Sequence, residues 1–184
     1  RAKKVGVLGA GMMGAGIALV AAQAGVEVVL VDQNQDVADK GKAYSEKYLN
    51  AGIKRGKVSD KNKIETLNRI LATDDYTKLS AADLIIEAVF EDTQVKSDVT
   101  KAVLEIVPKN CIFASNTSTL PITELAKASK YPENYIGIHF FSPVEKMLLV
   151  EIIKGEKTDN RAVAKALDFV RPVSYTHLTL PTIY

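Results

Sequence analysis

The stretch Val5–Gly14, VGVLGAGMMG, decides the fold of this chain. An apolar strand runs into the pattern GxGxxG, and residues 15–23 read as a helix that follows at once. Gly9 permits the tight turn out of the strand, Gly11 lets the backbone approach a pyrophosphate, and Gly14 lets helix and strand pack closely. The helix N-terminus offers unpaired N–H groups and the positive end of its dipole to the anion. The stretch therefore predicts a dinucleotide site.

Asp32 selects the cofactor. It ends the second expected strand, Glu27–Val31, and lies eighteen positions beyond Gly14, close to the spacing of about 20 expected for a carboxylate on the adenosine ribose. Its carboxylate would accept hydrogen bonds from a ribose 2′-OH and would repel a 2′-phosphate, and the next residue is Gln33 rather than Arg. We therefore predict NAD rather than NADP.

The composition is that of an ordinary soluble globular domain, with 47% hydrophobic and 25% charged residues among 184. A formal charge of +2 gives no support for binding nucleic acid or a membrane surface. Every apolar run is shorter than the ~20 residues that a membrane span requires. A single cysteine, Cys111, excludes an internal disulfide and is expected in the core; with only two histidines we expect no metal site.

Residues 34–71 depart from the simplest strand–helix–strand pattern. Gln35–Ala51 and Asp60–Ile70 read as two helices rich in Lys and Glu, with Ser59 as a candidate N-cap of the second. One interpretation is a solvated helical pair, which the residues alone favour. The other is an arm that reaches over the cofactor site and offers lysines to a phosphorylated substrate.

Polar residues follow two further expected strands. Asp83–Val89 reads as a buried parallel strand followed by Glu91, and Cys111–Ala114 runs into the polar cluster of residues 115–119. Open α/β sheets bind ligands at the carboxyl ends of their strands, although Ser and Thr there also cap helices. The whole pattern predicts an α/β, Rossmann-type, mostly parallel sheet with helices on both faces and an inserted two-helix arm after the second strand.

His139 and Glu151 resist a purely structural explanation. Residues 135–143 read as a strand that ends at His139, and residues 147–153 as a strand that holds Glu151 among apolar neighbours. An ionised carboxylate is costly to bury unless it is paired, and alternation places Glu151 on the same face as Leu149 and Ile153. We therefore expect Glu151 to be buried beside His139, orienting the imidazole and stabilising the imidazolium when it forms.

Four motifs resemble those of the L-3-hydroxyacyl-CoA dehydrogenases. They are the glycine turn with Met13, EAVFE at 87–91, SNTS at 115–118, and HFFSP at 139–143 with LVE at 149–151. The resemblance covers nearly everything from Lys3 to Val170. The chain is most similar to the dehydrogenase portion of bacterial multifunctional fatty-acid oxidation enzymes, in which an enoyl-CoA hydratase domain precedes it.

The resemblance implies NAD-dependent oxidation of L-3-hydroxyacyl-CoA to 3-ketoacyl-CoA in fatty-acid β-oxidation. Hydride would pass to NAD and a proton to His139, which Glu151 would hold, while Ser118 would hydrogen-bond the substrate oxygen. Ser142 stands where this family often has Asn, and would border the substrate. The two-helix arm would contact CoA, with Lys54 and Lys57 as candidate contacts.

On the cofactor side the resemblance implies three groups of contacts. Gly9, Gly11, Met13 and Gly14 would bind the pyrophosphate, and Asp32 would bind the adenosine ribose. Glu91, Lys96 and Asn116 would lie on the nicotinamide–ribose side. The implied partners are an acyl-CoA substrate and either a second copy of the protein or a fatty-acid oxidation complex. The implied location is the bacterial cytoplasm, and neither nucleic acid nor a membrane span is expected.

Residues 172–184 depart from the family. There the family continues with a strand, an Asn that contributes to catalysis, and a helical domain that completes the acyl-CoA cleft and forms the dimer. This chain reads RPVSYTHLTLPTIY from Arg171 onward. We therefore expect residues 1–171 to form the NAD-binding domain, residues 172–184 to be an atypical, non-native tail for which no fold is predicted, the helical domain to be absent, and His177 to have no role.

Two alternative functions compete with this one. The chain could bind NAD without turnover, as a fragment or as a structural relative; the His139–Glu151 pair argues against the latter. It could also be another β-hydroxyacid dehydrogenase, of the 3-hydroxyisobutyrate or 6-phosphogluconate type. Those enzymes rely on a catalytic Lys and lack the HFF and VEI context found here, which decides against them.

Overall fold

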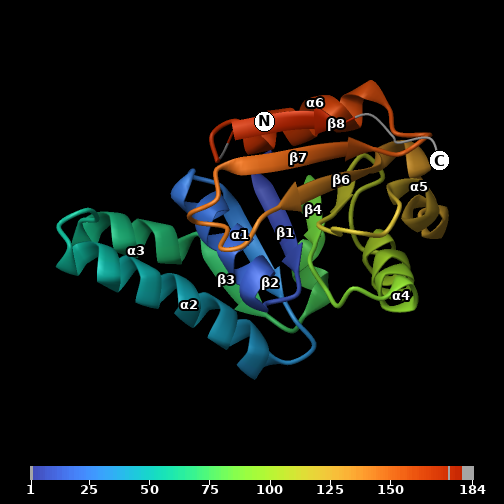
Figure 1. The fold of residues 1–184 in the computed structure, drawn as a ribbon. Coiled ribbons are helices and arrows are strands. Elements are labelled where there is room, and N and C mark those ends of the chain that lie inside the picture. The colour runs from blue at the N-terminus through green and yellow to red at the C-terminus, as the bar shows by residue number, and fades with distance from the viewer. Residues whose placement is uncertain (1, 174, 180–184) are drawn as a thin grey trace.

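The computed structural model describes residues 2–173 and 175–179, and these form one sheet with helices on both faces (Figure 1). Within them the sheet has eight strands in the order β3-β2-β1-β4-β5-β6-β7-β8. The strands are β1 Lys4–Leu8, β2 Glu27–Val31, β3 Ile70–Thr73, β4 Leu84–Glu87, β5 Ile112–Ser115, β6 Tyr135–Phe140, β7 Leu149–Lys154 and β8 Tyr175–Thr179. The α-helices are α1 Met12–Gln23, α2 Gln35–Lys54, α3 Asp60–Asn68, α4 Thr93–Leu104, α5 Ile122–Leu125 and α6 Asn160–Val170. Three short 3₁₀ turns are η1 Tyr76–Leu79, η2 Ala126–Ala128 and η3 Pro132–Asn134.

The strand order reverses at β1, which pairs in parallel with β2 on one side and with β4 on the other. This is the topological switch point at which doubly wound sheets bind their ligands. All the other pairings are parallel except that of β6 with β7, which is antiparallel. The prediction of a Rossmann-type, mostly parallel sheet is confirmed.

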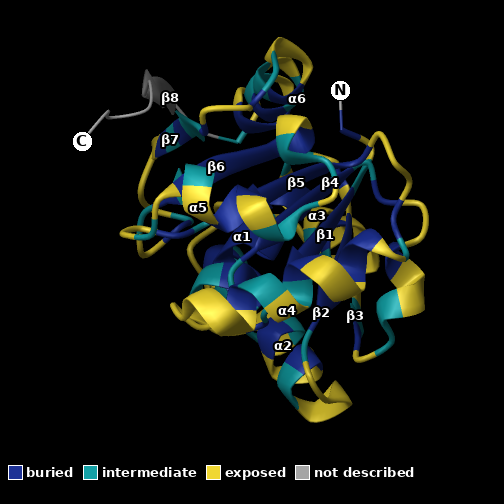
Figure 2. Cartoon of the chain, turned by 90° about the vertical axis from the view of Figure 1, so that its right-hand side faces the viewer, coloured by how far each residue is buried: buried dark blue, intermediate teal, exposed yellow. Residues whose placement is uncertain are grey.

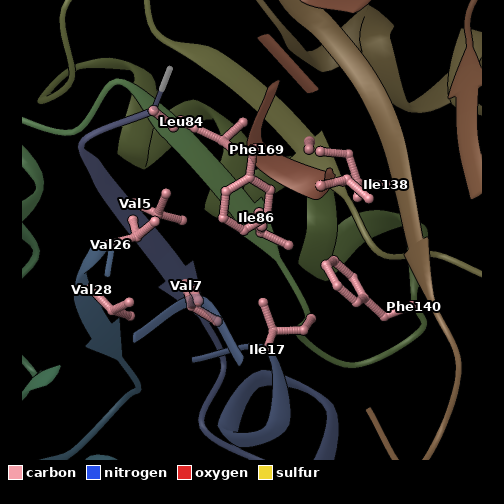
Figure 3. Close-up of a cluster of buried hydrophobic side chains, with 14 of the residues drawn as sticks. Val5, Val7, Ile17, Val26, Val28, Leu84, Ile86, Ile138, Phe140 and Phe169 are labelled. Atoms are coloured by element: carbon pink, nitrogen blue, oxygen red, sulfur yellow. The ribbon is translucent and has the colours of Figure 1, made fainter. Parts of the chain in front are cut away.

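Two apolar layers hold the helices on the sheet. Alternate residues of β1, β4 and β6, among them Val7, Ile86 and Ile138, pack against Ile17 of α1 and Phe169 of α6 (Figure 3). The intervening strand residues face α4 and α5 in a second cluster. The strands are therefore buried on both faces, which explains why their sequences are nearly continuous apolar runs. The outward faces of the helices stay exposed (Figure 2).

The arm predicted for residues 34–71 is present as α2 and α3. Asn34 caps α2 by accepting from the Val37 N–H at 3.0 Å, and Ser59 caps α3 by accepting from the Asn62 N–H at 3.1 Å, as expected for that serine. Helix α2 crosses α1 and then projects away from the sheet (Figure 1). The Tyr44 hydroxyl of α2 donates to the Glu145 carboxylate at 2.6 Å, which links the arm to the β6–β7 loop.

The chain after α6 returns to the edge of the sheet. Tyr175–Thr179 forms β8 and pairs in parallel with β7, with Leu149 opposite Tyr175. These five residues of the atypical tail therefore extend the sheet, because the edge left by β7 accepts another extended segment; the division of the chain at residue 171 stays a prediction. Residues 180–184 lie outside the described part of the chain, and the non-native origin of the tail stays a prediction.

Candidate functional site

The glycine turn after β1 has the geometry that a dinucleotide phosphate requires. Gly9 has a φ of +93°, a conformation that favours glycine. A Cβ on Gly14 would lie 1.7 Å from the Gly9 carbonyl oxygen, so helix α1 and the turn touch there without room for a side chain. A Cβ on Gly11 would meet nothing within 4 Å. Gly11 therefore borders the open space in which a pyrophosphate fits at the N-terminus of α1.

Asp32 at the end of β2 is tied directly to this turn. Its carboxylate accepts from the Ala10 N–H at 2.6 Å and from the Gln33 N–H at 2.7 Å. Asp32, Gly9 and Gly11 line one hollow, which continues toward Tyr76 and Phe90. An acceptor-only carboxylate at this position suits the two hydroxyls of an adenosine ribose. The residues present therefore fit the adenosine half of NAD.

A second hollow of about 320 Å³ lies beyond the turn, at the carboxyl ends of β4, β5 and β6. It brings together seven of the residues predicted from the sequence: Met13, Glu91, Lys96, Asn116, Ser118, His139 and Ser142. The remaining lining residues are Ala88, Val89, Phe140 and Phe141. Predicted cofactor and substrate residues thus share one cavity at the sheet edge where α/β folds place their ligands.

His139 and Glu151 form the pair expected from the sequence. They lie directly opposite each other in the β6–β7 ladder, and His139 Nδ1 is 3.1 Å from Glu151 Oε1. Because β7 is antiparallel, its first half lies at the carboxyl edge of the sheet, which brings Glu151 to the ligand side. The Phe141 ring packs against the imidazole at 4.5 Å between centroids.

The burial of Glu151 differs from the prediction. Its side chain is 31% exposed, whereas that of His139 is 15% exposed. Leu149 and Ile153, on the same face of β7, are exposed and half-buried respectively. This face of the strand is only partly covered by the described residues, so the carboxylate keeps contact with solvent. The pairing prediction holds, but its supposed cause, full burial of the acid, is wrong.

Three polar side chains of the loops complete the wall. Asn116 Oδ1 accepts from the Phe140 N–H at 2.8 Å, so its amide hydrogens are left for a ligand. Ser118 is exposed at the rim and donates its N–H to Glu91 at 3.2 Å. Ser142 lies next to Met12, with its Oγ 3.9 Å from the sulfur.

Lys96 and Glu91 belong to a larger polar cluster. The Lys96 ammonium lies 2.6 Å from Glu87 Oε1 and 3.3 Å from Glu91 Oε2. Glu91 also accepts a short hydrogen bond from the Thr117 hydroxyl. Burial opposes ionisation of Glu91, but the Thr117 hydrogen bond and the charge of Lys96 outweigh it and lower the pKa of this carboxyl. Glu91 is therefore an ionised acceptor at the rim of the hollow.

Sequence reasoning did not single out Glu87 as a member of the site. It ends β4, is fully buried, and also accepts from the Ser115 hydroxyl at 2.8 Å. The signal was available, because an acid at the end of the apolar run Leu84–Ile86 is as costly to bury as one in β7. Its partner Lys96 lies nine positions on, in the first turn of α4, and no simple spacing rule connects a strand end with that helix.

Lys54 and Lys57 stand apart from this cavity. Lys54 borders a shallow depression on α2 with Lys47, and Lys57 lies beside the end of α1 and the start of α3. Neither residue lines the hollow that holds His139. Their contact with CoA stays a prediction.

The doubly wound sheet, the glycine turn with its acidic partner, and the second hollow define the cofactor domain of a nicotinamide-dependent dehydrogenase. The particular family follows from comparison with known proteins. A family model described as 3-hydroxyacyl-CoA dehydrogenase, NAD binding domain, matches residues 4–180. The chain belongs to this family, and its cofactor is NAD.

Individual relatives agree with this assignment. The fatty acid oxidation complex subunit alpha of Psychrobacter arcticus is 46% identical over 158 residues, which are 86% of this chain and 22% of that protein. A probable 3-hydroxybutyryl-CoA dehydrogenase of Deinococcus radiodurans is 43% identical over 96% of this chain and 63% of its own length. The crystal structure of (S)-3-hydroxybutyryl-CoA dehydrogenase from Ralstonia eutropha superposes with a TM-score of 0.96 and 36% identity, over 99% of this chain and 65% of that one.

The chain is much shorter than several of these relatives. It spans 22–24% of the fatty acid oxidation complex subunits that it matches.

No α-helix in the described ranges has the length and apolarity needed to cross a bilayer.

Proposed function

We propose that this chain carries the cofactor-binding and proton-transfer half of an enzyme that oxidises L-3-hydroxyacyl-CoA to 3-ketoacyl-CoA in fatty-acid β-oxidation. The observation that carries the proposal is His139, paired with Glu151, on the wall of a hollow whose other walls hold the expected cofactor residues. When bound, NAD supplies the hydride acceptor. The protein's own task is to remove the hydroxyl proton and to hold the reacting carbon beside the cofactor.

His139 acts as the general base. With Nδ1 directed at the Glu151 carboxylate, the neutral imidazole carries its proton on Nδ1, and the lone pair on Nε2 accepts the substrate proton. Glu151 holds this tautomer and stabilises the imidazolium that forms. It is thus a positioning residue, following the base–orienter logic of other catalytic pairs.

Ser118 and Asn116 would supply hydrogen bonds to the bound ligands. Ser118, exposed at the rim, donates to the substrate oxygen, while the Asn116 amide faces the nicotinamide–ribose side. Ser142 is a shorter group than the Asn frequent in this family and reaches less far into the hollow. The acyl-CoA substrate itself, contacts of Lys54 and Lys57 with CoA, and assembly as a homodimer or within a fatty-acid oxidation complex belong to the proposal for the whole protein.

A direct experiment follows NADH absorbance after addition of acetoacetyl-CoA to this chain, once NADH binding is established by fluorescence. Oxidation of NADH by the wild-type chain supports the proposal, and His139→Gln should then cost about 10²–10⁴-fold in rate with nearly unchanged NADH affinity. Glu151→Gln retains the size of the side chain but lacks its charge, and should reduce the rate by a smaller factor. If His139→Gln turned over as fast as the wild type, the assignment of the base would be refuted.

A second candidate function is NAD binding without turnover. The exposure of Leu149 and Glu151 on the substrate side favours it for the isolated chain, because that face is only partly covered. NADH binding without oxidation of NADH by acetoacetyl-CoA would support this alternative. Adding the segment that follows in a longer relative would then restore activity only if the proposed chemistry is correct.

A further inference from the structure

A buried charge cluster forms part of the wall of the second hollow. Glu87 and Lys96 are 0% and 1% exposed, and their charged atoms are 2.6 Å apart. The Val89 N–H donates to Glu87 at 2.9 Å and the Ser115 hydroxyl at 2.8 Å. Three donors, those of Lys96, Val89 and Ser115, thus converge on the two carboxylate oxygens of Glu87.

The cluster is not electrically neutral. A second carboxylate, Glu91, lies 3.3 Å from the same ammonium group and is held in its ionised form by Thr117 and Lys96. Two carboxylates therefore share one lysine, and the cluster carries a net charge of −1. Among the described residues that line the hollow, Lys96 is the one Lys or Arg, so no further cation of that kind compensates there.

Fold stability does not account for this arrangement. Burying an ion pair costs desolvation energy that its Coulomb attraction often only offsets, and apolar residues of similar volume stabilise a core equally well. A second acid beside the pair adds repulsion without a further cation. The unbalanced charge is therefore explained better by what occupies the hollow than by packing.

We propose that this net negative charge sets the relative affinity of the domain for oxidised and reduced cofactor. The nicotinamide ring of NAD⁺ is positively charged, whereas the dihydronicotinamide ring of NADH is neutral. A charge of −1 in a partly dehydrated wall attracts the first ring and has no such attraction for the second. The inference rests on the proposed placement of the nicotinamide in this hollow and does not depend on the acyl substrate.

The effect has a direction that suits an oxidising enzyme. Favouring NAD⁺ helps the domain to bind oxidised cofactor and to release NADH after hydride transfer. One unit of cluster charge acts on the nicotinamide ring through a partly buried site with an effective dielectric constant of about 20 to 40. It should change the ratio of the dissociation constants for NAD⁺ and NADH by about tenfold.

The test compares Kd for NAD⁺ with Kd for NADH in variants that differ in cluster charge. Glu87→Gln and Glu91→Gln each change the net charge from −1 to 0, so both should raise the ratio Kd(NAD⁺)/Kd(NADH) about tenfold. The double variant Glu87→Gln/Lys96→Met restores a net charge of −1 and should return the ratio to the wild-type value. Contacts that both cofactor forms share cancel in the ratio, whereas loss of a merely structural role would move both constants together.

Two measurements keep the result decisive. Glu91 is 38% exposed, so Glu91→Gln remains informative if substitution of the buried pair prevents folding, and a ratio unchanged in that variant would overturn the inference. ADP-ribose, which lacks nicotinamide, reports whether the rest of the cofactor site is intact. A double variant whose ratio rises like that of Glu87→Gln would also overturn it, since the charge would then not be the cause.

A blocking variant separates failure of this inference from failure of the proposed site. Ser142→Trp places a large ring at the hollow and should weaken NAD⁺ and NADH relative to ADP-ribose. If it does so while the charge variants leave the ratio unchanged, the nicotinamide lies in the hollow and the electrostatic inference is wrong. If it weakens neither, the placement of the nicotinamide fails and the inference fails with it.

Discussion

Gly14 and Gly11 belong to the same turn, yet the structure predicts opposite consequences for replacing each with alanine. A Cβ on Gly14 would lie 1.7 Å from the Gly9 carbonyl oxygen and 2.8 Å from its carbonyl carbon. Both are backbone atoms, so α1 and the turn would have to separate by more than an ångström. A Cβ on Gly11 would meet nothing within 4 Å, and its φ of −67° is one that alanine adopts freely.

The magnitude for Gly14→Ala follows from two opposing effects. Alanine in a helix is favoured over glycine by about 1 kcal/mol. Forcing extra volume into a packed site costs about 1–3 kcal/mol and more when backbone atoms must move, so the clash prevails and the net loss is about 2 kcal/mol. For a chain of this length that corresponds to a fall in Tm of about 4–8 °C.

Gly11→Ala should change Tm by less than about 3 °C, since only the helix N-cap preference is altered. Its methyl group would instead fill the space that the pyrophosphate needs, so NADH affinity should fall at least about tenfold. Thermal unfolding and titration of NADH fluorescence measure the two effects separately. Equal losses of Tm in both variants, or unaltered NADH affinity in Gly11→Ala, would refute the division of roles.

Three further substitutions test other parts of the structure. Asp32→Ala should weaken NADH binding and reduce the difference in affinity between NADH and NADPH. An unchanged preference for NADH would mean that another group recognises the ribose. Burial raises the pKa of the Cys111 thiol to about 12, so the folded chain should resist iodoacetamide at pH 8. Its folding stability should decline as the pH rises from about 9 toward 12, because only the unfolded thiol ionises readily there, and Cys111→Ala should lessen that decline. Tyr44→Phe removes the hydroxyl that binds Glu145 and should lower stability by about 1 kcal/mol and speed proteolysis near residues 52–57; cleavage at the wild-type rate would show that this contact does not hold the arm.

Much of the fold could be predicted because its strands are short apolar runs with clear ends. The bounds of β2, Glu27–Val31, agree with the prediction to the residue, since Gly25 precedes the run and the polar residues Asp32 and Gln33 end it. Strand β8 could not be predicted in this way. Tyr175–Thr179 reads Tyr-Thr-His-Leu-Thr, with two adjacent polar residues and no strict alternation of polar and apolar residues, so its own pattern does not mark it as a strand.

The site could be predicted where a single residue carried an unusual cost of burying a charge. Prediction failed where several residues in a network shared that cost. His139 and Glu151 were found because an acid among apolar residues needs a partner a short distance away in sequence. The Glu87–Lys96 pair joins a strand to the following helix, and no periodicity reports the direction of those side chains. The exposure of Glu151 also escaped prediction, because apolar neighbours in sequence do not reveal what covers them in space.

The pairing of His139 with Glu151 has a consequence for how this domain can vary. The two residues face each other because of the hydrogen-bond register between β6 and β7, so this register sets the distance between them. Sliding β7 by one position would place Val150 or Ile152 opposite the imidazole, and the acid would turn to the other face of the sheet. Among the connecting residues 141–148, Val144 is buried and Glu145 binds Tyr44, but exposed members such as Met147 and Leu148 lie outside the ladder and can be replaced without shifting the register. A designer who wishes to reshape the rim of the hollow should therefore alter these exposed loop residues and leave every residue of the two strands in place.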